Sequence, residues 1–66
     1  MTITIDSSVS FDPCDFKIME DFMIMHIKNS NFVKTVLIEN SLGFETLSDD
    51  FLSIKIPIKS IISITF

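Results

Sequence analysis

Residues 51–66 read FLSIKIPIKSIISITF and decide the fold of this 66-residue chain. Isoleucine occupies every second position from Ile54 to Ile58, which is the pattern of a strand with one buried face. The same parity resumes from Ile62 to Phe66. A straight strand over the whole stretch would span about 50 Å, whereas a compact chain of this length has a radius of gyration of about 11 Å. We therefore predict two strands joined by a corner between Ile58 and Ile62.

The composition is that of one small domain, residues 1–66, that needs reinforcement. The chain is 47% hydrophobic, has a formal net charge of −4 and contains one Gly and one Cys. A chain this short buries only about 60% of its unfolded surface, and small domains usually add a disulfide, a metal or a partner chain. A single Cys excludes an internal disulfide, and Cys14 with His26 gives too few ligands for zinc. We therefore expect no metal and no cofactor, and a chain that associates with itself.

The N-terminal residues predict neither export nor membrane insertion. The opening MTITIDSSVS alternates and has no basic segment followed by an apolar run, so it lacks the pattern of a secretory signal. No segment approaches the roughly 18 apolar residues that a membrane span needs. Together with the free Cys14, this predicts a cytoplasmic protein without membrane contact.

The first third of the chain predicts two short strands and a short helix. Alternating residues indicate a strand at Thr2–Ile5, a turn at Asp6–Ser8 and a second strand at Val9–Phe11. Asp12 before a proline suits the start of a helix, with the aspartate as N-cap and the proline at the first helical position. We predict at most one short helix, over Pro13–Glu20.

The middle of the chain predicts an antiparallel hairpin. Phe22–Lys28 fits a strand buried on both faces, Asn29–Asn31 is a turn cluster, and Phe32–Ile38 is rich in β-branched residues. Gly43 is expected at a positive-φ turn position before a short strand at Phe44–Leu47. Short strands and turns at such regular spacing predict an all-β fold, either a small antiparallel barrel or a β-sandwich.

A resemblance supports the barrel alternative. The residues from 32 to 66, ending IKIPIKSIISITF, resemble the latter half of small SH3-like barrels, including the Sm-like group, and bacterial pleckstrin-like domains end in a similar phrase. The resemblance implies a small antiparallel SH3-like barrel. The Asp-containing loop and the Arg-Gly signature of the Sm motif match no residue of this chain, so no RNA-binding residues are carried over.

The chemical inventory predicts a protein that is not an enzyme. His26 lies in an apolar strand without a metal-ligand companion, and the carboxylate of Asp15 disfavours a thiolate at Cys14. Gly43 stands alone, so the chain has no phosphate-binding loop. Five lysines, no arginine and a net charge of −4 are also the wrong balance for nucleic acid.

These exclusions leave an acidic binding module that acts stoichiometrically. In size and charge the chain resembles the small acidic accessory inhibitors that phages and mobile elements encode. That resemblance implies a partner such as a host defence or nucleic-acid enzyme, or a small signalling ligand. The carboxylates predicted to face a protein partner are Asp12, Asp15, Glu45, Asp49 and Asp50.

The alternative function is that of an Sm-like oligomer that binds RNA or a nucleotide. An oligomeric ring would concentrate lysines on one face and so offset the acidic composition. The lysines in question are Lys34, Lys55 and Lys59.

The C-terminal residues also predict self-association. Ser60–Phe66 has no charged side chain and no proline, so an open edge there would be prone to aggregation. Pairing with Thr2–Ile5 could cover it within one subunit, but the small core favours pairing between subunits. We expect a homodimer or larger oligomer, with Ile62, Ile64 and Phe66 in the core or at the interface.

Overall fold

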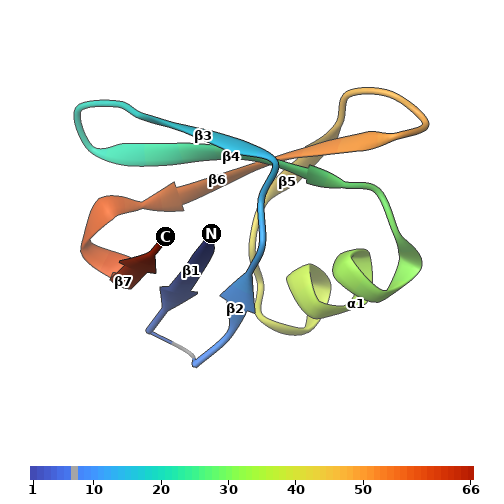
Figure 1. The fold of residues 1–66 in the computed structure, drawn as a ribbon. Coiled ribbons are helices and arrows are strands. Elements are labelled where there is room, and N and C mark those ends of the chain that lie inside the picture. Colours follow the sequence, from blue (N-terminus) through green and yellow to red (C-terminus); the bar gives the residue numbers. More distant parts are fainter. Residues whose placement is uncertain (7) are drawn as a thin grey trace.

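The computed structural model describes residues 1–6 and 8–66, and these form seven strands, one α-helix and one 3-10 turn (Figure 1). The strands make two antiparallel sheets, ordered β2-β1-β7 and β3-β4-β6-β5. The predicted all-β fold is therefore confirmed in part, as a mostly-β fold that also contains one short helix. The elements are β1 (Thr2–Ile5), β2 (Ser10–Phe11), β3 (Asp15–Ile18), β4 (Phe22–Lys28), α1 (Asn31–Glu39), β5 (Phe44–Thr46), β6 (Phe51–Pro57), η1 (Ile58–Ser60) and β7 (Ile61–Thr65).

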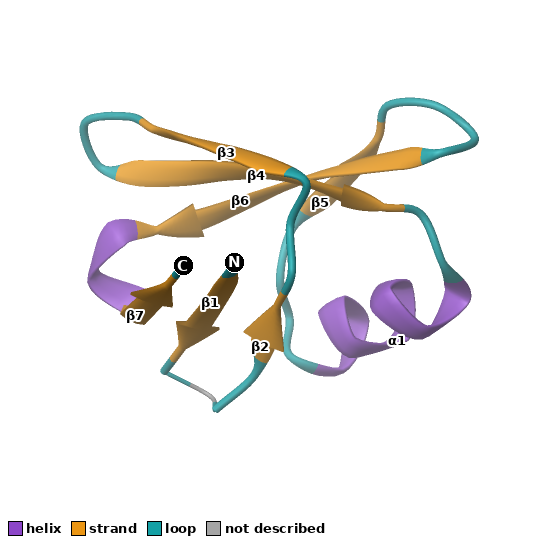
Figure 2. Cartoon of the chain, in the orientation of Figure 1, coloured by secondary structure: helices purple, strands orange, loops and turns teal. Residues whose placement is uncertain are grey.

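The three-stranded sheet and α1 lie on the same side of the four-stranded sheet (Figure 2). Side chains alternate along β4 and β6, so that every second residue points into the layer between the sheets. Both sheets stay open, and the expected closed barrel is wrong. The buried core consists of Ile3, Ile5, Phe11, Met23, Met25, Ile27, Leu37, Leu52, Ile54 and Ile56.

Residues 51–66 form two strands joined by a corner, as predicted. β6 ends at Pro57, the turn η1 makes the corner, and β7 follows at once. β7 pairs antiparallel with β1, with Ile3 opposite Ile64, and the register shifts by a bulge between Thr4 and Ile5. The termini consequently lie side by side (Figure 1). The predicted turn at Asp6–Ser8 includes Ser7, which lies outside the described residues.

The predicted helix over Pro13–Glu20 is wrong, because this segment contains the strand β3. Its residues alternate, with Phe16 packed against the core and Lys17 exposed. The Cys14 N–H donates to the His26 carbonyl and the Met19 N–H to the Phe22 carbonyl, which closes a hairpin with β4. Pairing with a long neighbouring strand outweighs the helix-start signal of a single aspartate and proline.

The predicted strand over Phe32–Ile38 is also wrong, since these residues belong to α1. The Val33 N–H donates to the Ser30 hydroxyl oxygen at 3.1 Å, so Ser30 is the N-cap of the helix rather than part of a hairpin turn. Leu37 is fully buried, and Val33 lies one turn before it on the core side. Burial of this face outweighs the strand preference of β-branched residues. β4 pairs with β3 and β6 instead.

The helix ends in a Schellman motif centred on Ser41. The Ser41 N–H donates to the Ile38 carbonyl at 3.1 Å and the Leu42 N–H to the Leu37 carbonyl at 2.9 Å, with Ser41 at φ 56°. The prediction that Gly43 takes a positive φ is wrong. Among the described residues, no helix is long and apolar enough to cross a membrane.

The Schellman motif predicts a stabilising substitution. Ser41→Gly should raise the free energy of unfolding by about 0.5–1 kcal/mol, because a side chain in the left-handed region costs about 1–2 kcal/mol and glycine's extra freedom in the unfolded chain offsets part of that gain. Urea denaturation measures the change.

Gly43→Ala is the matched control for the same turn. Its Cβ would meet no atom within 4 Å and its φ is not positive, so alanine should be neutral or add about 0.4–1 kcal/mol. A loss of stability in both variants would contradict the assigned turn.

Candidate functional site

The four-stranded sheet has one face on the core and one face that no described element covers. We call the uncovered side the outer face. It is formed by the residues that alternate with the buried ones along β3, β4, β5 and β6. Its members are Asp15, Lys17, Phe22, Ile24, His26, Lys28, Glu45, Phe51, Ser53, Lys55 and Pro57.

The strand register arranges the outer face in rows across the sheet. In one row Lys17 lies opposite Ile24, which lies opposite Lys55. The next row runs Asp15, His26, Ser53 and Glu45, with the carboxylates on the two edge strands. These two rows thus have two lysines and two carboxylates around a less polar centre, and Lys28 adds a third lysine at one end of the face.

His26 and Asp15 form a cross-strand pair on this face. The His26 Nδ1–H donates to Asp15 Oδ1 at 2.7 Å, and both side chains are exposed, so the pair contributes about 0–1 kcal/mol to stability. The pair borders a hollow with a volume of about 250 Å³, and Cys14 borders it too. Among the described residues, the hydrogen bond of the imidazole is to Asp15 and not to this thiol.

Lys55 lies at the junction of two larger hollows. Its Nζ lies 4.0 Å from the centre of the Phe22 ring, a cation–π contact. On one side is a hollow of about 370 Å³ bordered by Ile24 and Glu45. On the other is a hollow of about 750 Å³ that Lys59 also borders, together with the carboxylates of Glu20 and Asp21.

Of the five carboxylates expected to face a partner, two lie on the outer face and two lie in a loop of the same sheet. Asp15 and Glu45 are on the outer face, and Asp49 and Asp50 are in the β5–β6 loop, next to Leu47 and Ser48 of the 250 Å³ hollow. Asp12 lies apart from them. It accepts a hydrogen bond from the Thr2 hydroxyl at 2.8 Å.

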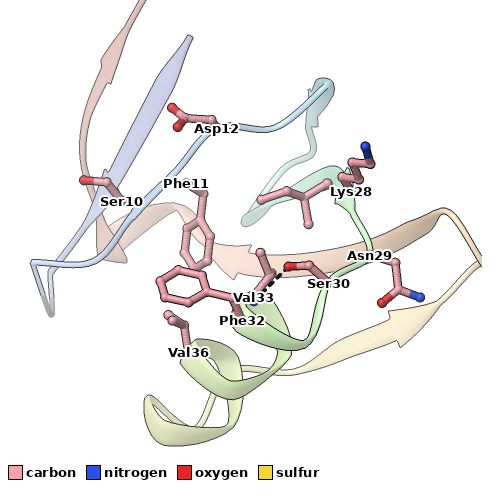
Figure 3. Close-up of a pocket in the computed structure, with 10 residues that line it drawn as sticks. Ser10, Phe11, Asp12, Lys28, Asn29, Ser30, Phe32, Val33 and Val36 are labelled. Carbon is pink, nitrogen blue, oxygen red and sulfur yellow. Dashed lines mark hydrogen bonds between the residues drawn. The ribbon is translucent and has the colours of Figure 1, made fainter.

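Asp12 instead borders a groove between β2 and α1, with a volume of about 510 Å³ (Figure 3). The Phe11 and Phe32 side chains and two valines of α1 line the groove, while Asp12 and Lys28 are among its polar residues. The groove is thus largely apolar, unlike the charged border of the outer face.

The three lysines of the alternative function do not lie together in one subunit. Lys55 and Lys59 share the 750 Å³ hollow, whereas Lys34 is on α1, on the core side of the four-stranded sheet. The three residues expected at an interface between subunits differ from one another in exposure. Ile62 and Phe66 are exposed, and Ile64 packs partly against the core.

Several outer-face residues were not singled out from the sequence, notably Lys17, Ile24 and Ser53. Once Phe22–Lys28 is known to be a strand, its alternation puts Phe22, Ile24 and His26 on one side. Their cross-strand neighbours depend on the register, which no local pattern gives.

In the part of the chain that the structure describes, no cluster of three His, Cys, Asp or Glu side chains could hold a metal ion. The outer face is therefore characterised by its shape, its exposed charges and its apolar centre. Comparison with known proteins does not add to this description, because no family model, no curated protein and no solved structure matches the chain.

Proposed function

We propose that this protein is a non-enzymatic binding module that holds a protein partner on its outer face and acts by stoichiometric contact. The observation that carries the proposal is the uncovered face of the four-stranded sheet, with an apolar centre and charged borders. Protein interfaces have the same organisation, a desolvated apolar centre within a polar rim.

The distribution of polar groups supports contact with a partner rather than catalysis. The described residues bury no polar or charged side chain. Enzymes stabilise transition states with preorganised polar groups that are withdrawn from water. On the outer face Phe22 and Ile24 are half-buried between charged neighbours, which suits a surface that becomes dry only when a partner covers it.

Charge supports a partner with a basic surface. The outer face has three lysines and two carboxylates, so the formal net charge of −4 arises elsewhere on the molecule. Asp49 and Asp50 contribute to it at the rim of the face. An acidic surround accelerates the approach of a basic protein, while the apolar centre of the contact face can be buried without leaving a charge unpaired.

A basic partner is consistent with inhibition of a host defence or nucleic-acid enzyme by a phage or mobile-element accessory protein. Only the small size and the acidic charge of the chain support this narrower proposal. Such an inhibitor would cover the surface that its target uses to bind phosphate groups.

The second candidate function is binding of a nucleotide, RNA or a small signalling ligand. The 750 Å³ hollow favours it, because Phe22 offers a ring for stacking and Lys55 and Lys59 offer cations for phosphate. Glu20 and Asp21 border the same hollow and repel phosphate. We therefore favour the protein partner.

Removing the apolar centre of the outer face should weaken partner binding. Ile24→Gln should raise Kd about five- to thirtyfold, because a central apolar contact at an interface contributes about 1–2 kcal/mol. The measurement is affinity capture from a host lysate with the wild-type protein, followed by calorimetry with the protein recovered.

Ile38→Gln is the matched control for that experiment. Ile38 is the same residue type, is exposed, and lies on α1, on the other side of the four-stranded sheet. Equal weakening by both variants would contradict a contact through the outer face.

The acidic rim should govern the association rate. Asp49→Asn combined with Asp50→Asn should slow association severalfold and reduce its salt dependence, with little effect on dissociation. Stopped-flow or surface-plasmon kinetics at several salt concentrations measure both rates. Asp12→Asn, which removes a carboxylate from the separate groove, should have a smaller effect.

The second candidate function would be favoured if the wild-type protein captured no host protein but bound RNA or a nucleotide. Lys55→Ala together with Lys59→Ala should then abolish the binding of that ligand.

A further inference from the structure

The two sheets have four edge strands among the described residues, and three of them are poor templates for another strand. β2 has two residues, β5 has three and includes Glu45, and β3 includes Asp15 and Lys17. Short length and charged side chains are the usual protection against pairing between molecules.

The fourth edge, β7, lacks this protection. It is five residues long, is bonded on one side to β1, and has no charged side chain and no proline. The bulge in its pairing with β1 is the only protective feature among those that edges usually show. Ile62 is 62% exposed, so this edge leaves a large apolar side chain in water.

Further exposed apolar residues surround this edge. On either side of β7 the chain contacts the β3–β4 hairpin. The Ile58 N–H of η1 donates to the Asp21 carbonyl, and the Phe66 ring, just after β7, lies 6.3 Å from the Phe16 ring. Phe66 is 89% exposed. We give the name β7 patch to the exposed apolar residues of these contacting segments, which are Ile18, Met19, Ile58, Ile62 and Phe66. Half of the ten exposed large apolar side chains are in it.

We propose that β7 pairs with β7 of a second copy of this chain, antiparallel and across a two-fold axis. The charge distribution selects this occupant. Two copies, each with a formal net charge of −4, repel one another over most of their surface, and this repulsion is smallest where side chains are uncharged. A basic foreign partner gains no attraction from Ser60–Phe66 and is drawn to the acidic loops instead.

The two-fold arrangement is self-complementary. With the axis near Ser63, the two Ser63 residues lie opposite one another, and Ile62, which is the extra residue of the bulge, comes next to Ile64 of the second copy. The two three-stranded sheets then join into one sheet ordered β2-β1-β7-β7-β1-β2. The backbone groups on the free side of β7 gain partners, and the β7 patches approach one another.

Pairing at β7 leaves both outer faces free, because β7 belongs to the other sheet. The dimer would therefore present two copies of the surface on which the proposed function rests. Two linked sites raise the apparent affinity for any target that displays its basic surface twice. The inference stands without the proposed function, since it concerns a separate edge.

The test is the mass of the protein in solution from micromolar to millimolar concentration, by sedimentation equilibrium. We expect the wild type to reach twice the 7.5 kDa of one chain, and Ile62→Lys to halve that mass by introducing charge at the paired edge. Ile62 is exposed, so circular dichroism of the variant should match the wild type. Ile64 is not suitable, because it also packs against the core.

Ile38→Lys provides the control, with the same substitution at a residue that is 68% exposed on α1. It should retain the doubled mass. Amide hydrogen exchange gives a second measurement, since the β7 amides that do not bond to β1 should become protected as concentration rises. A wild-type mass of one chain at all concentrations would overturn the proposal. So would an Ile62→Lys protein that keeps the doubled mass, or dimerisation without protection of β7.

Discussion

The ladder between β4 and β6 is the interaction on which the rest of the fold depends. It pairs seven residues on each strand, and on its inner side Met23, Met25 and Ile27 lie opposite Ile56, Ile54 and Leu52. All six side chains are buried, and each contributes about 1.5–3 kcal/mol through the water that it no longer orders. Every other layer of the molecule packs against this strip, and so its alternation decides which face is core and which is left for a partner.

The elements that cover the strip are individually weak. α1 has nine residues, too few to be stable as an isolated helix, and it places one fully buried side chain, Leu37, on the core. The three-stranded sheet contains a two-residue strand and joins the first and last residues of the chain. Closing such a long loop costs entropy, which the burial of Ile3 and Ile5 offsets. The covering layer is therefore stable only as part of the complete domain.

How much of this fold can be predicted follows from the range of the interactions. Residues 51–66 were assigned correctly because their alternation is local and because a straight strand exceeds the size of the domain. α1 was assigned as a strand because Val33, Val36 and Ile38 favour strands locally, while the contact that selects the helix, Leu37 with the core, is distant in sequence. Two local signals could have identified this helix. Ser30 suits an N-cap, and Val33 and Leu37 are four residues apart, which is the spacing of one helix face.

The candidate site likewise combines residues that local sequence identifies with neighbours that only the strand pairing provides. The sequence supplied the carboxylates of Asp15 and Glu45, but their places at opposite edges of one row depend on the pairing of four strands. The Asp15–His26 contact likewise arises from register and from no motif. The helix-start signal of Asp12 and Pro13 instead predicted a helix over the residues that form β3.

The arrangement of charge links the two proposed surfaces. β6 contributes Lys55 to the outer face and continues through η1 into β7, so a single segment of chain serves both. The segment changes character at the corner, since its last charged side chain, Lys59, is in η1 and Ser60–Phe66 has none. A strand with Lys55 on its outer side suits a solvated face beside a charged partner, whereas a strand without charged side chains suits the proposed contact with an identical acidic chain. The corner at η1 turns the chain from one sheet into the other, so the two proposed contacts would lie on different sheets.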